Sequence, residues 1–175
     1  MFDRLRLWTK IMLMMGLAIG GVGAVLTFTN LTNLTRVVQH AERSALSAHY
    51  QAIANAVAAE SRTAQALASL VASLPLVQEK FDAGDRKALS DVFVPGFKSL
   101  VQDVGIEQFQ FHTAPATSWL RVHLPAKFGD DLSTFRHTVV QSNQTQKPVR
   151  GLEGGVAGLG VRGVVPVQHH GRHVG

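Results

Sequence analysis

The chain of 175 residues contains no cysteine, so disulfide bonds, thiolate nucleophiles and cysteine-based zinc sites are excluded. Charged residues are also scarce, at 17 % against roughly 25 % in a typical soluble chain, whereas 46 % of the residues are hydrophobic. A chain this apolar is not disordered throughout. Its length provides for about one ordinary domain of ~100–150 residues and an accessory segment.

Long runs of basic residues are missing, although the net charge is +5 and the pI is about 10.1. The excess of Lys and Arg is divided between residues 1–29, at +2, and residues 105–175, at +3. A surface that binds the phosphate backbone requires clustered cations. We therefore expect no nucleic-acid partner.

Recognisable catalytic patterns are missing as well. The sequence has no Ser/His/Asp order, no paired-carboxylate motif and no P-loop. We expect a protein that is not an enzyme, with no catalytic residues and no cofactor.

One literal GxGxxG pattern runs from Gly158 to Gly163. A dinucleotide site needs a helix that begins at such glycines, so that phosphate meets the helix N-terminus. Here a Val-Val-Pro-Val run follows, which favours an extended strand. We expect these glycines at hairpin or bulge positions.

Histidines at positions 169, 170 and 173 lie close to the C-terminus. A metal site would need a carboxylate beside them or a helix that places His169 and His173 on one face, and this glycine-containing segment indicates neither. We expect a solvated hairpin tip with Gly171 in the turn, and no metal site.

Residues 11–29 form an uncharged, apolar run, IMLMMGLAIGGVGAVLTFT. Its 19 residues match the ~20 that a helix needs to cross a bilayer. Arg4, Arg6 and Lys10 precede it, which places residues 1–10 in the cytoplasm and the rest outside. A cleaved signal peptide is the alternative, but the run is longer than the usual ~7–15 residues of such a segment. We expect a retained single-pass anchor in the inner (cytoplasmic) membrane, with residues 30–175 extracytoplasmic.

Helical periodicity fills residues 30–104. Apolar residues recur at spacings of three and four between Leu46 and Leu74, and no glycine or proline interrupts residues 30–74. We expect a long stalk helix that ends at Pro75 and pairs two copies of the chain. A second helical region follows, with a turn at 83–85, Asp85 as its N-cap, a break at Pro95-Gly96 and an end at Gly105.

Residues 105–175 change to a strand-rich pattern. We expect strands at 106–112, 117–124, 149–157 and 161–168, and the start of a fifth at His173. A helix capped by Asp130 or Asp131 should run to about Gln146. The order predicts an α+β fold with one antiparallel sheet.

One strand face is cationic. Alternation places Trp119, Arg121 and His123 on the same side of residues 117–124, and Lys127 follows shortly. A polar face can simply meet solvent. The alternative is a ligand-binding site in which Arg121 holds a carboxylate, His123 adds a donor and Trp119 covers the apolar part of the molecule. We therefore take these four residues as candidate ligand-binding residues for a small, carboxylate-bearing molecule.

Five segments of the C-terminal part form a specific set: FH at 111–112, PATSWLRVH at 115–123, KFGDDLSTFR at 127–136, KPVRGLE at 147–153 and GLGVRGVVPV at 158–167. Through these segments, residues 109–175 resemble the membrane-distal part of the double Cache sensory domain of bacterial methyl-accepting chemotaxis proteins and some sensor kinases. With the helical lead-in, the resemblance covers roughly residues 30–175. It implies a PAS-like antiparallel sheet on a long, dimer-forming helix that senses a small molecule in the periplasm and transmits the signal inward.

The resemblance predicts chemotaxis signal transduction as the leading function. The input domain of a membrane sensor histidine kinase is the second interpretation, and a membrane-anchored structural helical protein is a third from another class. Receptors of this family continue into a membrane-proximal module, so we expect the sheet to be truncated at the C-terminus and the chain to be an N-terminal fragment.

Overall fold

A computed structural model describes residues 7–155 and 158–175, and the chain divides into two compact units, Met1–Ile53 and Ala54–Gly175. Arg4 and Arg6, on which the predicted orientation depends, lie outside the described residues. The fold is α+β, as predicted, with 62 % helix and 17 % strand.

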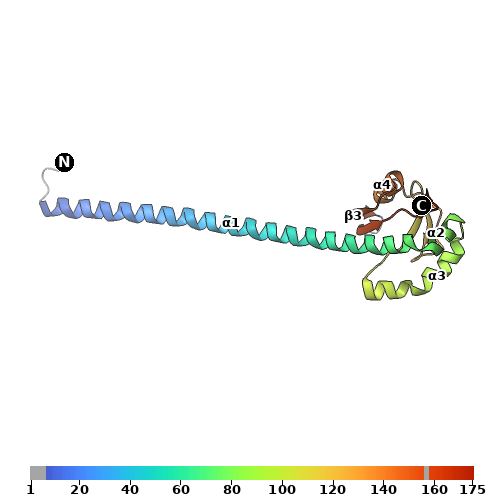
Figure 1. The fold of residues 1–175 in the computed structure, drawn as a ribbon. Helices are drawn as coiled ribbons and strands as arrows, with labels where there is room; N and C mark the ends of the chain where they lie inside the picture. Colours follow the sequence, from blue (N-terminus) through green and yellow to red (C-terminus); the bar gives the residue numbers. More distant parts are fainter. Residues whose placement is uncertain (1–6, 156–157) are drawn as a thin grey trace. The chain divides into compact units, whose positions relative to one another are not determined.

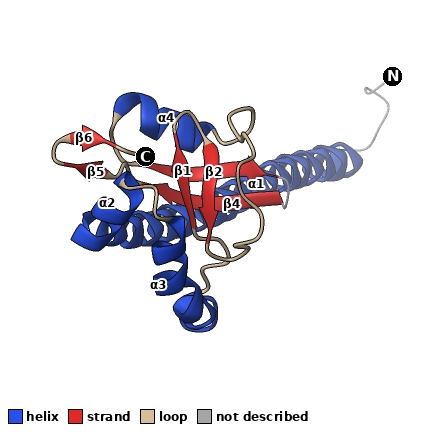
Figure 2. Cartoon of the chain, turned by 90° about the vertical axis from the view of Figure 1, so that its right-hand side faces the viewer, coloured by secondary structure: helices blue, strands red, loops and turns tan. Residues whose placement is uncertain are grey.

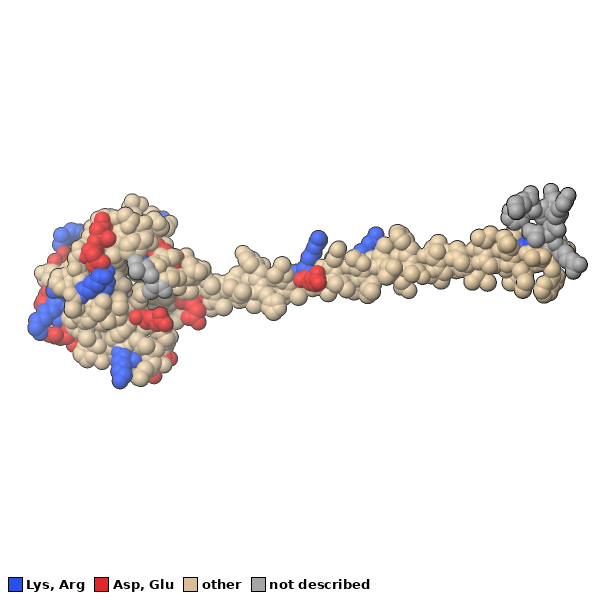
Figure 3. All heavy atoms as spheres, turned by 180° about the vertical axis from the view of Figure 1, so that it is seen from behind, with Lys and Arg blue, Asp and Glu red and all other residues tan. Residues whose placement is uncertain are grey.

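Helix α1 (Leu7–Ser73) contains the apolar run and continues beyond it (Figure 1). It is long and apolar enough to cross a membrane by length and composition. Its threonine hydroxyls, including those of Thr27 and Thr29, donate hydrogen bonds to carbonyls one turn earlier, which satisfies these polar groups without water. Figure 3 shows that this part of the helix has few charged side chains.

Proline and aspartate set the next boundaries where the sequence predicts them. Leu74 is extended, and Pro75 begins helix α2 (Pro75–Asp82). The carboxylate of Asp85 accepts a hydrogen bond from the Ala88 N–H at 3.1 Å and caps helix α3 (Arg86–Ser99).

The predicted break at Pro95-Gly96 is wrong. Helix α3 continues through Pro95 to Ser99, and a π-helical turn, η2 (Leu100–Val104), follows. Proline removes one helical hydrogen bond, and because Pro95 and Asp91 are both exposed, water can satisfy the carbonyl that is left free. Gly105 then ends the segment with a φ of 74°, as predicted.

The strands form three antiparallel pairs instead of the one predicted sheet (Figure 2). Proline and turn residues shorten the expected strands. A turn hydrogen bond from the Leu124 N–H to the Arg121 carbonyl ends the second strand early, and Pro166 lies beyond the end of the fourth. The pairs are β1 (Gln110–Thr113) with β2 (Thr117–Arg121), β3 (Val149–Gly155) with β4 (Gly158–Val164), and β5 (Gln168–His169) with β6 (Arg172–His173).

Helix α4 (His137–Thr145) begins later than predicted. Asp131 does act as a cap, but its carboxylate binds the backbone N–H and hydroxyl of Ser133, which closes a local turn. The predicted turn at Gly171 is confirmed, since His170 and Gly171 have φ values of 50° and 74° between β5 and β6.

The core of the second unit lies where α2 and α3 pack against β1 and β2. Val77 and Leu89 from the helices are completely buried, and Leu120 is 1 % exposed. Phe81 and Phe111 pack edge to face at 5.7 Å. This core fixes β1, from which two side chains of the candidate site project.

Candidate ligand-binding site

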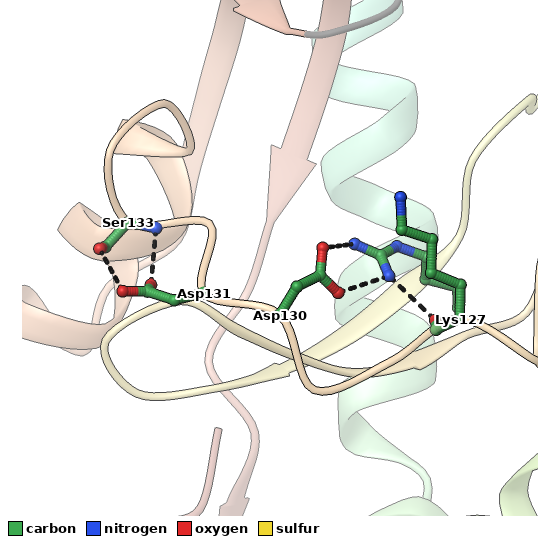
Figure 4. Close-up of polar contacts among 5 residues, drawn as sticks. Lys127, Asp130, Asp131 and Ser133 are labelled. Carbon is green, nitrogen blue, oxygen red and sulfur yellow. Dashed lines mark hydrogen bonds and ion pairs between the residues drawn. The ribbon is translucent and has the colours of Figure 1, made fainter.

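Arg121 has a carboxylate partner within the protein, Asp130, which Figure 4 labels together with Lys127. Its guanidinium donates to both oxygens of Asp130 at 2.7 Å, and to the Lys127 carbonyl at 2.9 Å. The hydrogen bond from Arg121 lowers the pKa of Asp130 to about 2. Arg121 is 7 % exposed, so this fork fastens the 127–130 loop to β2.

The other three predicted binding residues have separate surroundings. The ring centroids of Trp119 and Phe81 lie 4.6 Å apart. Nδ1 of His123 lies 3.3 Å from the Phe109 carbonyl oxygen. Burial lowers the pKa of His123. The side chain of Lys127 is exposed.

The predicted alternation of this strand holds from Thr117 to Leu120, since Ser118 and Leu120 are buried whereas Thr117 and Trp119 are half-buried. Arg121 departs from it, because its side chain is buried against the 127–130 loop. The binding role of Trp119, Arg121, His123 and Lys127 stays a prediction.

A cavity of about 670 Å³ lies elsewhere in the second unit. Its walls come from the C-terminal part of α1, the η2–β1 segment, α4 and β4. None of the four residues predicted from the cationic strand is among the described residues that line it. Apolar side chains, including Leu67, Val71 and Val164, share the lining with polar ones, which include Gln110, His112, Arg136, Asn143 and Arg162.

Two arginines of this lining share one buried carboxylate. Nε of Arg162 lies 2.8 Å from Oε2 of Glu153, and Nη1 of Arg136 lies 3.8 Å from the same oxygen. Glu153 also accepts hydrogen bonds from the Thr138 N–H at 2.7 Å and the Thr138 hydroxyl at 3.1 Å. Because its carboxylate lies at the N-terminus of α4, Glu153 ties β3 to that helix.

The cluster of Arg136, Glu153 and Arg162 is cationic overall. Burial lowers the pKa of both arginines, and Arg162 contributes to the shift at Arg136. Arginine nevertheless stays protonated in proteins, so two positive charges face one negative charge. Arg136 is only 8 % exposed.

Four buried polar atoms of the lining make no hydrogen bond within the described residues. One of them, Nε of Arg162, is paired with Glu153 by charge at 2.8 Å, and the other three have no such partner: Nη1 of Arg136, Nε2 of His112 and Oε1 of Gln110. Burial, followed by the charge of Arg136, lowers the pKa of His112 to about 4. The imidazole is therefore neutral at pH 7 and offers one donor and one acceptor. A bound molecule could satisfy all three atoms.

Sequence reasoning did not select these cavity residues. Their types are ordinary, and only the folded chain brings together β1, α4 and β4. A signal was nevertheless present, because His112, Arg136, Glu153 and Arg162 all lie within the segments that carry the family resemblance.

A long apolar helix joined to an α+β unit with a ligand-sized cavity is the arrangement of a membrane-linked sensory domain. A family model described as the double sensory domain of two-component sensor kinase matches residues 39–175. The chain belongs to this family, a double Cache family, as the resemblance predicted. Searches of the curated proteins and of the solved structures found no significant match.

The described residues contain no group of three or more His, Cys, Asp or Glu that could hold a metal ion. His169 and Arg172 instead bind the carboxylate of Asp82, with His169 Nδ1 at 2.9 Å, which attaches the β5–β6 hairpin to α2.

Proposed function

We propose that the chain is the extracytoplasmic small-molecule-sensing region of a transmembrane chemoreceptor of the methyl-accepting type. The family match over residues 39–175 carries this proposal, because it assigns a sensory role to most of the chain. The cavity supports it by providing a volume suited to a metabolite. In this role the protein binds and transmits, and it does not catalyse a reaction.

The proposed anchor is residues 11–29, which would hold the chain in the inner membrane. The apolar length of α1 supports it. Beyond the anchor, α1 exposes Leu46, Tyr50 and Ile53, at 72 %, 68 % and 66 %. Such a row on one helix suits a second copy of the same helix, so we propose a homodimer.

The input domain of a membrane sensor histidine kinase is the second candidate. The description of the matching family, which names two-component sensor kinases, favours it. The two outputs leave different covalent marks. We expect the native protein, isolated from its cells after labelling with methyl-labelled methionine without protein synthesis, to carry base-labile methyl esters. Acid-labile phosphoryl label without methyl esters would establish the kinase instead.

A thermal-shift screen of the full chain in detergent tests the sensing role itself. The screen should contain organic acids, amino acids, amines and uncharged metabolites. We expect at least one compound to raise the unfolding midpoint, since binding to the folded state stabilises it. A screen in which no compound of any class shifts the midpoint would contradict the proposal.

The carboxylate preference and the four residues predicted from the cationic strand have their own test. If Arg121 binds the carboxylate, Arg121→Ala should weaken carboxylate binding by about ten- to a hundredfold. Lower stability with unchanged affinity would show that Arg121 serves only its pairing with Asp130.

A further inference from the structure

We propose that the cavity binds a small organic monoanion, whose negative group is held by Arg136 and Arg162. This inference rests on the proposed sensing function and deepens it, because it names the binding residues and the charge of the ligand. Its basis is the charge balance, the unpaired donor and the apolar wall of the cavity.

The charge balance at the buried end of the cavity favours one negative charge. Arg136 and Arg162 share Glu153, which leaves one positive charge uncompensated. A buried charge without a partner is costly, so a single anionic group would stabilise the cluster. Two acidic side chains of the lining, Glu60 and Glu107, are exposed, and solvent screens them.

An unpaired donor faces this position. Nη1 of Arg136 is buried, and its separation of 3.8 Å from Glu153 exceeds hydrogen-bond length. Gly155 provides the space for this arrangement, because a Cβ atom there would lie 2.5 Å from Nη1 of Arg136 and 3.1 Å from Nη2 of Arg162. Glycine therefore lets the two guanidinium groups lie against the β3 backbone.

The remaining lining residues indicate the chemistry of the rest of the ligand. Leu67, Val71 and Val164 provide an apolar wall for a hydrocarbon body. The unpaired Oε1 of Gln110 can accept a hydrogen bond, and the neutral His112 can donate or accept one. A monocarboxylate with an apolar body fits these surroundings, whereas a polyamine would meet the uncompensated positive charge.

The probes that test this are monocarboxylates from butyrate to 3-phenylpropionate, with the corresponding primary amides and amines as matched neutral and cationic compounds. Titration calorimetry of the full chain in detergent measures their affinities. We expect the acids to bind and their amides and amines to bind at least tenfold more weakly.

Arg136→Gln should weaken binding of the acids by about ten- to a hundredfold. Arg150→Gln is the matched control, because Arg150 is exposed, bonds only Gln65 among the described side chains and lies outside the cavity lining. It should leave the affinities within twofold. If circular dichroism shows that Arg136→Gln does not fold, Gly155→Ala is the second variant. It keeps both charges but displaces Arg136, so it should also weaken binding.

The outcomes separate this inference from the sensing role. If amides or amines bind and the acids do not, the monoanion inference is wrong and the sensing role stands. Equal affinity of the acids for the wild type and a folded Arg136 or Gly155 variant would also overturn it. If none of these probes binds, the inference is wrong, and the sensing role fails only if the wider screen is also silent.

Discussion

Arg121 and Arg136 are both buried arginines of the second unit, and their partners give them different roles. Arg121 has both oxygens of Asp130 within hydrogen-bond distance, so it holds the 127–130 loop, and its predicted binding role is untested. Arg136 lies beside a carboxylate that Arg162 already occupies. The sequence identified Arg121 as a cation on the strand but did not identify Asp130 as its partner. The loop after β2 must turn back toward the strand before the two side chains meet.

The first prediction at the residue scale concerns this partner. Asp130→Asn should lower the free energy of unfolding by about 1–3 kcal/mol, because a buried guanidinium loses its charged acceptor. Urea unfolding of the full chain measures this. Asp91→Asn is the matched control, since Asp91 pairs with Lys87 on an exposed face, where solvent screens the pair and its contribution to stability is small. Equal effects of the two substitutions would contradict the structural role of Asp130.

A second prediction follows from His112. Its pKa is about 4 in the folded protein against 6.5 for the free side chain, so the unfolded state binds more protons between these values. His112 should therefore make stability decrease as pH falls from about 6.5 to 4, by about 3 kcal/mol in total.

Urea midpoints between pH 7.5 and 4.5 measure this effect, and His112→Gln should remove its share of the slope. His137→Gln, at an exposed histidine, is the control. A slope that His112→Gln leaves unchanged would show that another group causes it.

At the scale of elements, the sequence predicted local boundaries well and contacts between elements poorly. Pro75 and the Asp85 cap are set by neighbouring residues, so their patterns sufficed. The helix break predicted at Pro95 was wrong because the effect of a proline depends on whether water reaches the carbonyl that it leaves free. The strand pairing could not be predicted because it joins segments far apart in the chain. The cavity depends on the same long-range contacts.

Gly163 illustrates such a contact. The sequence predicted a hairpin or bulge glycine, whereas the structure places it against α1, with the position of an added Cβ 2.1 Å from the Gln65 backbone nitrogen. Gly163→Ala should destabilise the second unit by about 1–3 kcal/mol, because a helix backbone cannot move aside without repacking.

Thermal unfolding of the full chain measures this effect. Gly154→Ala is the control in the neighbouring strand, because no atom of the described residues beyond its chain neighbours lies within 4 Å of a Cβ added there. If both variants unfold at the same temperature, β4 does not pack tightly on α1.

At the scale of the whole molecule, we propose one membrane anchor and pairing of two copies through α1. The absence of cysteine makes an engineered thiol unique in the chain. Ile53→Cys should give oxidative dimers in membranes, because this residue belongs to the exposed apolar row. Arg62→Cys, at an exposed residue outside that row, should cross-link less. Equal or absent cross-linking at both positions would argue against the homodimer.

We expect a small molecule to bind in the cavity of the second unit. Titration calorimetry of the full chain, with the compound that gives the largest shift in the screen, measures this binding. Ala68 lines the cavity on α1, so Ala68→Trp should occupy part of it and weaken binding at least tenfold. Ala66→Trp, at an exposed residue outside the lining, should not. Wild-type affinity in a folded Ala68→Trp variant would contradict the account.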